Sequence, residues 1–429
     1  MADVCRLRWE SRTMEYNFAV AAVWVALALL SSVLAARVKI AGALMEILVG
    51  VAAGGVVTYF LGADATGSKL PWLTFLASTG SVLLTFLAGA ELDPAALRVK
   101  WKEVLLVGFV SFGAPFLGCA MLARFALGWA WPASWLAGVA LSTTSMAVVY
   151  AVMLEYGFNR TEFGKGVLGA CFVTDLGTVV ALGLIFSPFT WRTAVFVAVC
   201  AAACVGLPFV TSRLLRRFGG TTSEFETKWV LLLVFGLGAL ASWSGSEAVL
   251  PAYIAGMVLA GTLGRDHGYI RRLRTLTIGL LTPFYFLRAG SLVSVPALAA
   301  APLVLLALFG GKVGTKIFGL VPTIGLFRKD RRERWYYTLL MSTGLTFGTI
   351  SAIFGLTHGI VSQDQYSWLV AVVIGSAVVP TIVANAIFMP RHLLARTVPD
   401  AAVVPAGALQ QPAAQVRVEA SKVRPEGEA

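Results

Sequence analysis

Asp175 is an acidic residue in the middle of a long apolar segment, and a hydroxyl residue, Thr174, directly precedes it. A carboxylate placed about nine residues into a membrane-spanning helix costs ~2.5–3.5 kcal/mol on insertion scales. Such a residue is usually kept because it binds something, and a proton or a small cation suits a single carboxylate. The alternative is a structural ion pair with a lysine elsewhere in the chain. Thr174 either supplies a further oxygen ligand or serves helix packing.

Two clusters of hydroxyl residues lie in the middle of other apolar segments, Ser142-Thr143-Thr144-Ser145 and Ser342-Thr343-Gly344-Leu345-Thr346. Helices that unwind near the midplane expose backbone carbonyls, and transporters bind ions there. We therefore predict two broken helices that cross. The alternative is that these hydroxyls bond to carbonyls of their own helix or to neighbouring helices. The predicted cation and proton site comprises Asp175, Thr174, Thr143, Thr144 and Ser145, with Thr343, Gly344 and Thr346 from the second break.

Further charged residues lie within or beside apolar segments. Lys312, flanked by glycines, needs an acid or the carbonyl end of a helix, whereas Lys316 is interpreted as a lysine that snorkels to the interface. Arg288 cannot lose its proton and must face a cavity or a partner, for which Glu46 and Glu247 are the candidates. Lys312, Arg288 and Glu46 are thus predicted to be supporting charges. We interpret His358, near a helix end, as an interfacial residue rather than a pH sensor.

The elements that position these residues must be membrane helices. The chain of 429 residues is 58% hydrophobic and only 13% charged, which is typical of a polytopic helical membrane protein. We predict an all-α fold with about thirteen spans, of which the eighth and ninth are short and joined by a turn at Gly245. The expected spans are Tyr16–Ala36, Ile40–Phe60, Trp72–Gly89, Val104–Ala123, Ser134–Leu154, Gly166–Phe186, Ala194–Thr211, Trp229–Trp243, Ala248–Leu263, Leu276–Val293, Leu298–Val321, Trp335–Leu356 and Trp368–Met389.

The net charge of +12 is explained by the distribution of lysine and arginine between the loops. If the loops are assigned alternately with the N-terminus outside, one set holds 22 Lys and Arg and the opposite set only 3. This bias indicates an inner (plasma) membrane protein with a cytoplasmic C-terminus, and it leaves no case for nucleic acid binding. We expect an N-terminal segment 1–15, a transmembrane domain 16–390 and a cytoplasmic, mostly disordered tail 391–429, with a short helix near His392.

No catalytic or cofactor-binding pattern is present. The few His residues lie at or near helix ends, no nucleophile pairs with a base, and no Gly-rich nucleotide-binding segment occurs. Cys200 and Cys204 share a helix face but have no carboxylate or histidine beside them, so packing is the preferred interpretation. We therefore predict neither an enzyme nor a cofactor.

Similar short words recur in the two halves of the chain, about 200 residues and seven spans apart. Phe86-Leu87-Ala88-Gly89 resembles Phe286-Leu287-Arg288-Ala289-Gly290, the word Leu48–Gly54 resembles Ile254–Gly261, and the two hydroxyl clusters correspond to each other. Because the offset is an odd number of spans, the second copy would cross the membrane in the opposite sense. This is an inverted-topology repeat, which is typical of secondary transporters.

Four words in this order resemble the monovalent cation:proton antiporters of the Na⁺/H⁺ exchanger superfamily, in the branch with NapA-type and Kef-type transporters. The resemblance covers roughly residues 16 to 390. The words are Met45-Glu46-Ile47-Leu48-Val49-Gly50, Leu84-Thr85-Phe86-Leu87-Ala88-Gly89-Ala90-Glu91-Leu92-Asp93, Thr144-Ser145 and Pro251-Ala252-Tyr253-Ile254-Ala255-Gly256.

By this resemblance, Asp175 is the transport carboxylate and Lys312 the basic residue of the helix before the second broken segment. The family fold has a dimerisation domain and a core domain that moves like an elevator, so a homodimer is expected. Thr174 stands where electrogenic members carry a first Asp, and Arg288 replaces a small residue. With one titrating acid, we predict electroneutral 1:1 exchange of Na⁺ or K⁺ for protons. The alternatives are a cation channel or sensor on the same scaffold, and a Na⁺-coupled carrier of organic solutes.

Overall fold

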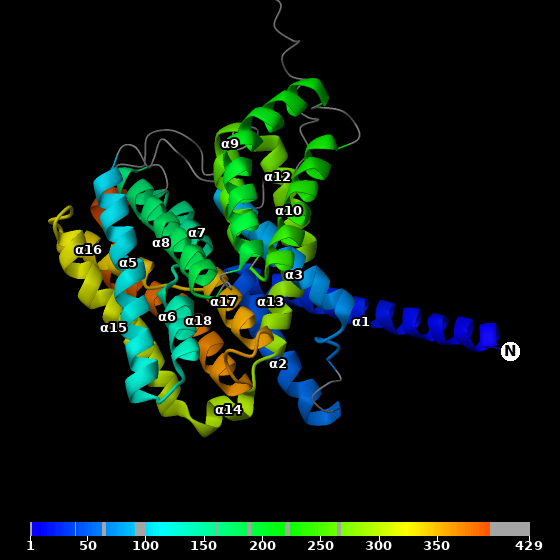
Figure 1. Ribbon diagram of the computed structural model, residues 1–429. Helices are drawn as coiled ribbons and strands as arrows, with labels where there is room; N and C mark the ends of the chain where they lie inside the picture. Colours follow the sequence, from blue (N-terminus) through cyan, green and yellow to red (C-terminus); the bar gives the residue numbers. More distant parts are fainter. Residues whose placement is uncertain are drawn as a thin grey trace, which may run out of the picture.

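The computed structural model describes residues 2–394, apart from 39, 62–65, 91–99, 159–160, 187–189, 219–223, 247 and 264–266. Within these residues the chain forms helices and short connections, and no strand occurs. The predicted all-α fold is therefore confirmed. Figure 1 shows the N-terminal helix projecting away from a bundle that the other helices form.

The helices fall into three kinds by length and continuity. Nine are long and continuous: α1 (Ala2–Val38), α2 (Gly42–Leu61), α3 (Pro71–Ala90), α5 (Trp101–Met121), α8 (Glu162–Phe186), α9 (Trp191–Phe218), α10 (Phe225–Ser244), α15 (Pro302–Gly325) and α18 (Gln363–Val383). Two pairs of half-helices follow one another closely, α6 (Trp131–Ser142) with α7 (Met146–Glu155), and α16 (Arg331–Met341) with α17 (Thr346–Thr357). The shorter elements are α11 (Val249–Leu263), α12 (His267–Leu276), α13 (Thr282–Ser291), α14 (Val295–Ala300), α19 (Arg391–Leu394) and the π-helical turns η1 (Leu122–Ala126), η3 (Thr277–Leu281) and η4 (Ala384–Phe388).

Eleven helices in the described part of the chain are long and apolar enough to cross a membrane, against the thirteen spans expected. The two remaining spans are also helical. Ala248–Leu263 is the shorter helix α11, and Leu276–Val293 is η3 followed by α13, which continue α12 without a gap. α10 and α11 are separate helices, and the turn predicted at Gly245 is present with a left-handed φ of 73°. α1 begins at Ala2, and its apolar part of membrane-spanning length is Met14–Val38, so the predicted boundary after residue 15 falls within one continuous helix. Of the predicted tail, only Arg391–Leu394 is described, and it is helical.

Four glycines bring two pairs of helices into backbone contact. A Cβ atom built on Gly50 of α2 would lie 2.3 Å from Leu287 O of α13, and one on Gly290 would lie 2.1 Å from Ile47 O. The crossing of α3 with α11 repeats this pattern, because a Cβ on Gly89 would lie 2.4 Å from Tyr253 O and one on Gly256 2.1 Å from Phe86 O. These glycines belong to the words that recur in the sequence. The contacts are reciprocal, as a two-fold arrangement requires; the membrane orientation of each copy stays a prediction.

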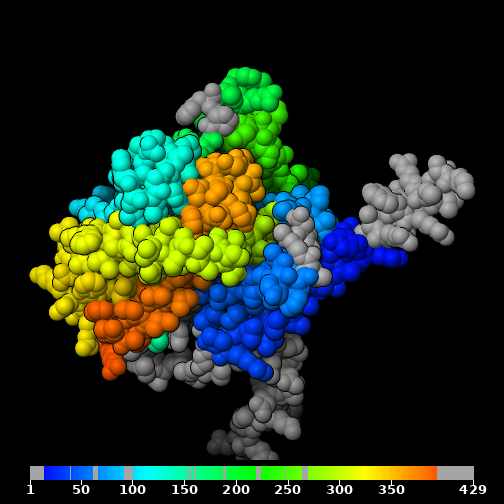
Figure 2. Space-filling view, turned by 90° about the horizontal axis from the view of Figure 1, so that it is seen from below, coloured from blue at the N-terminus to red at the C-terminus, as the bar shows by residue number. Residues whose placement is uncertain are grey.

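The remaining contacts divide the helices into two groups. α5–α8 and α15–α18 pack against one another, and α1–α3, α9–α11 and α13 form the second group. Where the groups meet, the Tyr253 hydroxyl of α11 donates to Phe172 O of α8 at 3.2 Å. Seen from below, the yellow-green surface of α14 and the start of α15 crosses the molecule beside the orange surface of the C-terminal helices (Figure 2). The first group contains both pairs of half-helices and thus positions the predicted site.

Candidate cation-binding site

Both hydroxyl clusters interrupt their helices, as predicted. The first break (Thr143, Thr144 and Ser145) separates α6 from α7, and Thr143 has an extended backbone with φ −62° and ψ 152°. The second break (Thr343, Gly344 and Leu345) separates α16 from α17, of which Thr346 is the first residue.

The two breaks contact each other directly. The backbone N–H of Ser145 donates to Thr343 O at 3.2 Å, and the Thr144 hydroxyl donates to Met341 O at 2.9 Å. These bonds satisfy backbone groups that the interruptions release. The predicted crossing of two broken segments is therefore present in the structure.

Local hydroxyl bonds explain why the helices end here. The Thr143 hydroxyl donates to Ala140 O at 3.1 Å and the Thr343 hydroxyl to Leu340 O at 2.8 Å, so each threonine bonds back to the end of its own helix. Such side chains offer the backbone an alternative to further helical bonds. The Ser145 hydroxyl accepts from Val148 N at 3.3 Å and caps the start of α7. The interpretation as local bonds and the interpretation as broken helices thus both apply.

Asp175 of α8 is buried, with only 2% of its surface exposed, and its Oδ1 atom has no hydrogen-bond partner. Thr174 directs its hydroxyl away from this oxygen, because it donates to Ala170 O at 2.9 Å and lies 3.4 Å from Gly108 O of α5. Of the two roles open for Thr174, the geometry supports packing between α8 and α5. Asp175 therefore presents a buried carboxylate oxygen that has no hydrogen-bond partner in the protein.

Lys316 is completely buried, so its interpretation as a snorkelling lysine is wrong. Its ammonium group donates to Ser111 Oγ of α5 at 2.8 Å and to Thr144 Oγ1 at 2.9 Å. It also interacts electrostatically with Asp175, although the two form no direct ion pair. Lys316, and not Lys312, is thus the lysine of α15 that interacts with Asp175, and the role given to Lys312 by resemblance stays a prediction.

Lys312 lies one turn away on the same face of α15, also completely buried, and its Nζ atom has no hydrogen-bond partner. It reaches the second break rather than an acid, because a Cβ atom on Gly344 would lie 2.1 Å from Nζ. Lys312 therefore bonds neither to an acid nor to a carbonyl at a helix end, which were the partners expected for it. Ser111, which the sequence reasoning missed, is a single serine in an apolar helix and gave no signal of its role.

Arg288 and Glu46 are both buried but do not pair with each other. Arg288 Nε donates to Ser68 O at 2.8 Å, and the Oε2 atom of Glu46 has no partner. Of the two candidate partners of Arg288, Glu46 is therefore not bonded to it, and a loop carbonyl accepts from the guanidinium instead. The other candidate, Glu247, lies outside the described residues, as do Glu91 and Asp93 of the second resemblance word.

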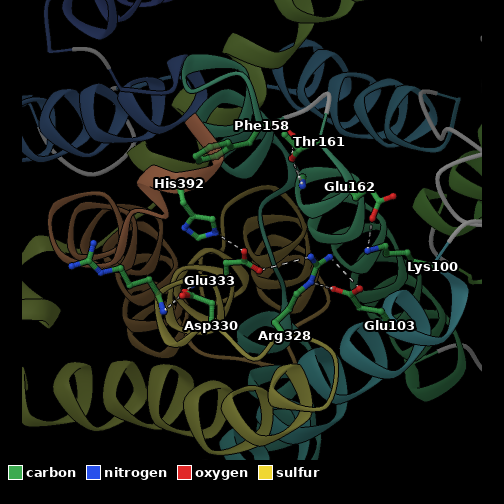
Figure 3. A network of polar contacts seen from close by, with 11 residues as sticks. Lys100, Glu103, Phe158, Thr161, Glu162, Arg328, Asp330, Glu333 and His392 are labelled. Atoms are coloured by element: carbon green, nitrogen blue, oxygen red, sulfur yellow. Dashed lines mark hydrogen bonds and ion pairs between the residues drawn. The ribbon is translucent and has the colours of Figure 1, made fainter. Parts of the chain in front are cut away.

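A network of ion pairs joins helix ends within the first group of helices, which contains both breaks (Figure 3). Arg328 bonds to Glu103 of α5 at 2.9 Å and lies 3.8 Å from Glu333 of α16. Glu333 also contacts the ring of His392 of α19, with 2.8 Å between Nε2 and Oε1. The helices that carry Ser111 and the second break are therefore tied together at their charged ends.

The arrangement suits reversible binding of one small cation. An ionised carboxylate with an unpaired, buried oxygen is costly unless it takes up a proton or meets a cation. Hydroxyl and backbone oxygens of the crossing are ligands of the type that alkali ions accept. Among the described residues, no group of three or more His, Cys, Asp or Glu could hold a metal ion. The chemistry therefore centres on one carboxylate.

Comparisons with known proteins agree with this geometry. The model of the transmembrane sodium/hydrogen exchanger family matches residues 25–389. A protein of Methanocaldococcus jannaschii named probable Na⁺/H⁺ antiporter 3 is 23% identical over 334 residues, which cover 74% of this chain and 84% of that protein. Cation/H⁺ antiporter 17 of Arabidopsis thaliana is 25% identical over 82% of this chain, and the glutathione-regulated potassium-efflux protein KefC of Cronobacter sakazakii 25% over 73%. The chain spans about half the length of these last two, 45% and 53%.

The solved structure of the sodium proton antiporter MjNhaP1 from Methanocaldococcus jannaschii at pH 8 has the same fold. It superposes with a TM-score of 0.67 at 14% identity and covers 89% of this chain and 98% of its own. The family match extends over most of the chain and includes both broken helices and Asp175. The protein is therefore a multi-pass membrane protein that belongs to the sodium/hydrogen exchanger family of cation/proton antiporters.

Proposed function

We propose that this protein exchanges Na⁺ or K⁺ for protons and that Asp175 carries the proton and the cation in turn. The observation that carries the proposal is the buried, unpartnered Oδ1 atom of Asp175, which interacts electrostatically with Lys316, the lysine bonded to Thr144 of the first break. Thr143, Thr144 and Ser145 supply the nearby hydroxyl and backbone oxygens. The names of the relatives include both sodium and potassium, and oxygen ligands suit both ions.

The charges at the crossing support electroneutral 1:1 exchange. Asp175 is the single acid there among the described residues, and Lys316 donates to two hydroxyl oxygens rather than to the carboxylate. If Lys316 keeps its proton throughout the cycle, only the Asp175 proton is exchanged for a cation. One charge then moves in each direction and no net charge crosses the membrane.

The two groups of helices support an elevator mechanism, in which the group with both breaks moves against the other. α9 and α10 of the second group have few buried residues, so they are free to contact lipid or a second copy. We include in the proposal a homodimer in the inner (plasma) membrane with a cytoplasmic C-terminus, as the loop charges predict.

The test of the site is a dye-based exchange assay in proteoliposomes with Na⁺, K⁺ and Li⁺. We expect Asp175→Asn to abolish proton-coupled cation flux, by at least a hundredfold, while the melting temperature Tm changes little, because amide and acid have the same shape. Asp364→Asn, an exposed acid in the first turn of α18, is the matched control and should retain full exchange. Retained coupled flux in Asp175→Asn contradicts the site.

The stoichiometry needs a separate measurement. In liposomes without an imposed potential, a voltage-sensitive dye should show no potential when a cation gradient drives proton movement. A potential that builds up with turnover contradicts 1:1 exchange and points to release of a second proton by Lys316. Cation flux without proton movement at channel-like rates points instead to a channel on this scaffold.

A further inference from the structure

The ammonium group of Lys312 has no part in the exchange just proposed. Lys312 and Lys316 lie one turn apart on α15, and both are completely buried. Lys316 has two hydroxyl partners, whereas Lys312 Nζ has no hydrogen-bond partner. A buried polar group without a partner is costly, so its persistence points to a role.

Three polar atoms from three elements converge on Gly344. A Cβ atom on this glycine would lie 2.1 Å from Lys312 Nζ, 3.0 Å from Thr143 Oγ1 of the first break and 3.3 Å from Ser376 Oγ of α18. The Lys312 ammonium group thus lies where a side chain on Gly344 would be, and two hydroxyl oxygens lie within about 3.3 Å of the same point. We call Gly344, Thr143 and Ser376 the cradle.

Both hydroxyls of the cradle use their protons elsewhere. Thr143 uses its proton to donate to Ala140 O at 3.1 Å, and Ser376 uses its proton to donate to Val373 O at 2.8 Å. A hydroxyl has one proton and two lone pairs, so each oxygen is left as an acceptor. Two acceptor oxygens beside a bare backbone are suited to a cation and not to an anion.

We propose that the cradle is a second site for a monovalent cation and that Lys312 fills it with an ammonium group tethered to α15. The tethered cation keeps Na⁺ and K⁺ out of this place, so that a single free cation is bound beside Asp175. The effect on transport rests on the proposed function, whereas the occupancy of the cradle by a cation does not.

Removing the tether should open the cradle to a free amine. In Lys312→Ala the lost side chain leaves room for methylammonium, which has the same charge and the same N–H donors as the lysine head. We expect methylammonium chloride to raise the Tm of purified Lys312→Ala saturably, by about 2–4 °C, because it binds the folded state. Tetramethylammonium chloride at equal concentration, which has no N–H group, should give no such rise.

Two control variants make this test specific. Parent protein should not respond to methylammonium, because its cradle is filled. Lys312→Met keeps the volume of the side chain and should also not respond. Lys312→Ala/Ser376→Ala should need at least tenfold more methylammonium for half of the Tm rise, since one of the two acceptor oxygens is gone.

Lys312→Ser opens the same space and serves as a second variant if Lys312→Ala is poorly folded. Recovery of either variant as monodisperse protein only when methylammonium is present also supports the cradle. An equal response to both salts, or no response and no recovery in both variants, overturns the proposal. Repeating the titration in Lys312→Ala/Asp175→Asn separates the two proposals, because the cradle should still bind methylammonium even if Asp175 has no role in exchange.

Discussion

The two breaks interrupt similar apolar helices but present different side chains at their crossing. The first break has three hydroxyl residues, Thr143, Thr144 and Ser145, and the second has Thr343 followed by Gly344 and Leu345. Thr144 Oγ1 accepts from Lys316 at 2.9 Å. Gly344, at the corresponding place, offers no side chain, and Lys312 Nζ lies against it without a partner.

The presence of a hydroxyl at Thr144 and its absence at Gly344 explain why two neighbouring lysines differ in their hydrogen bonds. Lys312 and Lys316 are four residues apart, so they project from the same face of α15. Each reaches one break, and only the break with a hydroxyl at the contact satisfies its ammonium group. The first break also caps α7 through Ser145, whereas Leu345 before α17 makes no side-chain cap. We infer that the first break provides polar contacts, whereas the second leaves room for the Lys312 ammonium group.

Of the variants that test this difference between the breaks, removal of the Thr144 hydroxyl, which accepts from Lys316, should slow exchange most. Thr144→Val keeps the shape but leaves the buried ammonium with Ser111 as its one hydroxyl acceptor. The loss of a partner for a buried charged donor costs about 1–3 kcal/mol, which corresponds to about 5- to 150-fold slower exchange if the whole cost is added to the barrier. The rate is measured in the proteoliposome assay with Na⁺ and K⁺.

Thr343→Val is the matched variant in the second break. Its hydroxyl bonds only to Leu340 O of its own helix, and its carbonyl, which accepts from Ser145, is unchanged. We expect a smaller loss of exchange than in Thr144→Val, at most about tenfold, because an ordinary local hydrogen bond contributes only ~0.5–1.5 kcal/mol. Equal losses in both variants would show that the two breaks do not differ in the way described.

The breaks were predictable from sequence because clustered polar residues are rare in the middle of an apolar span unless the helix is interrupted there. The hydroxyl clusters at 142–145 and 342–346 predicted both interruptions. Their corresponding places in the two repeats indicated that the interrupted segments cross. The placement of Asp175 in the middle of α8 was equally clear. These features depend on local residue types and on repeat distance, both of which can be read along the chain.

The partners of the charged residues could not be read in this way. Lys312 and Lys316 share a helix face, so only their depth relative to Thr144 and Gly344 decides which one has a hydroxyl partner. Ser111 comes from a helix with no other polar signal at this depth, and Arg288 bonds to a backbone carbonyl, which every residue has. Pairing between distant segments depends on packing, and here sequence proximity and charge were poor guides.

A smaller effect is expected from adding a methyl group to the second break. In Gly344→Ala the new Cβ would lie 2.1 Å from Lys312 Nζ, and the far end of a flexible side chain can shift. We expect a loss of about 1–2 kcal/mol of stability, measured as a lower Tm. In the Lys312→Ala background the same substitution should cost much less, and a loss of equal size there would contradict the contact.

The smallest effect concerns how the two broken helices begin. α6 starts after Ala130, which makes no side-chain cap, whereas α16 starts after Asp330, whose Oδ1 accepts from Arg332 N at 2.7 Å and Glu333 N at 2.9 Å (Figure 3). The hydrogen bond from the Glu333 backbone lowers the pKa of Asp330 below its ordinary value, and the one from Arg332 adds to this. A lowered pKa means that the cap stabilises the fold above the ordinary value near ~3.9 and is lost as the pH falls through the lower, folded value.

Asp330→Ala should therefore cost about 1 kcal/mol at pH 7, the typical contribution of an N-cap. Between about pH 7 and pH 5 the difference in Tm from the parent should stay constant, because the carboxylate is ionised in both the folded and the unfolded state. Below about pH 4 it should shrink as the parent loses its charged cap. Asp330→Asn keeps a cap without a titrating group, so its Tm relative to Asp330→Ala should not depend on pH. A parent that keeps its full advantage over Asp330→Ala down to about pH 2 would mean that the cap acts through shape rather than charge, and α16 would then begin in the same pH-independent way as α6.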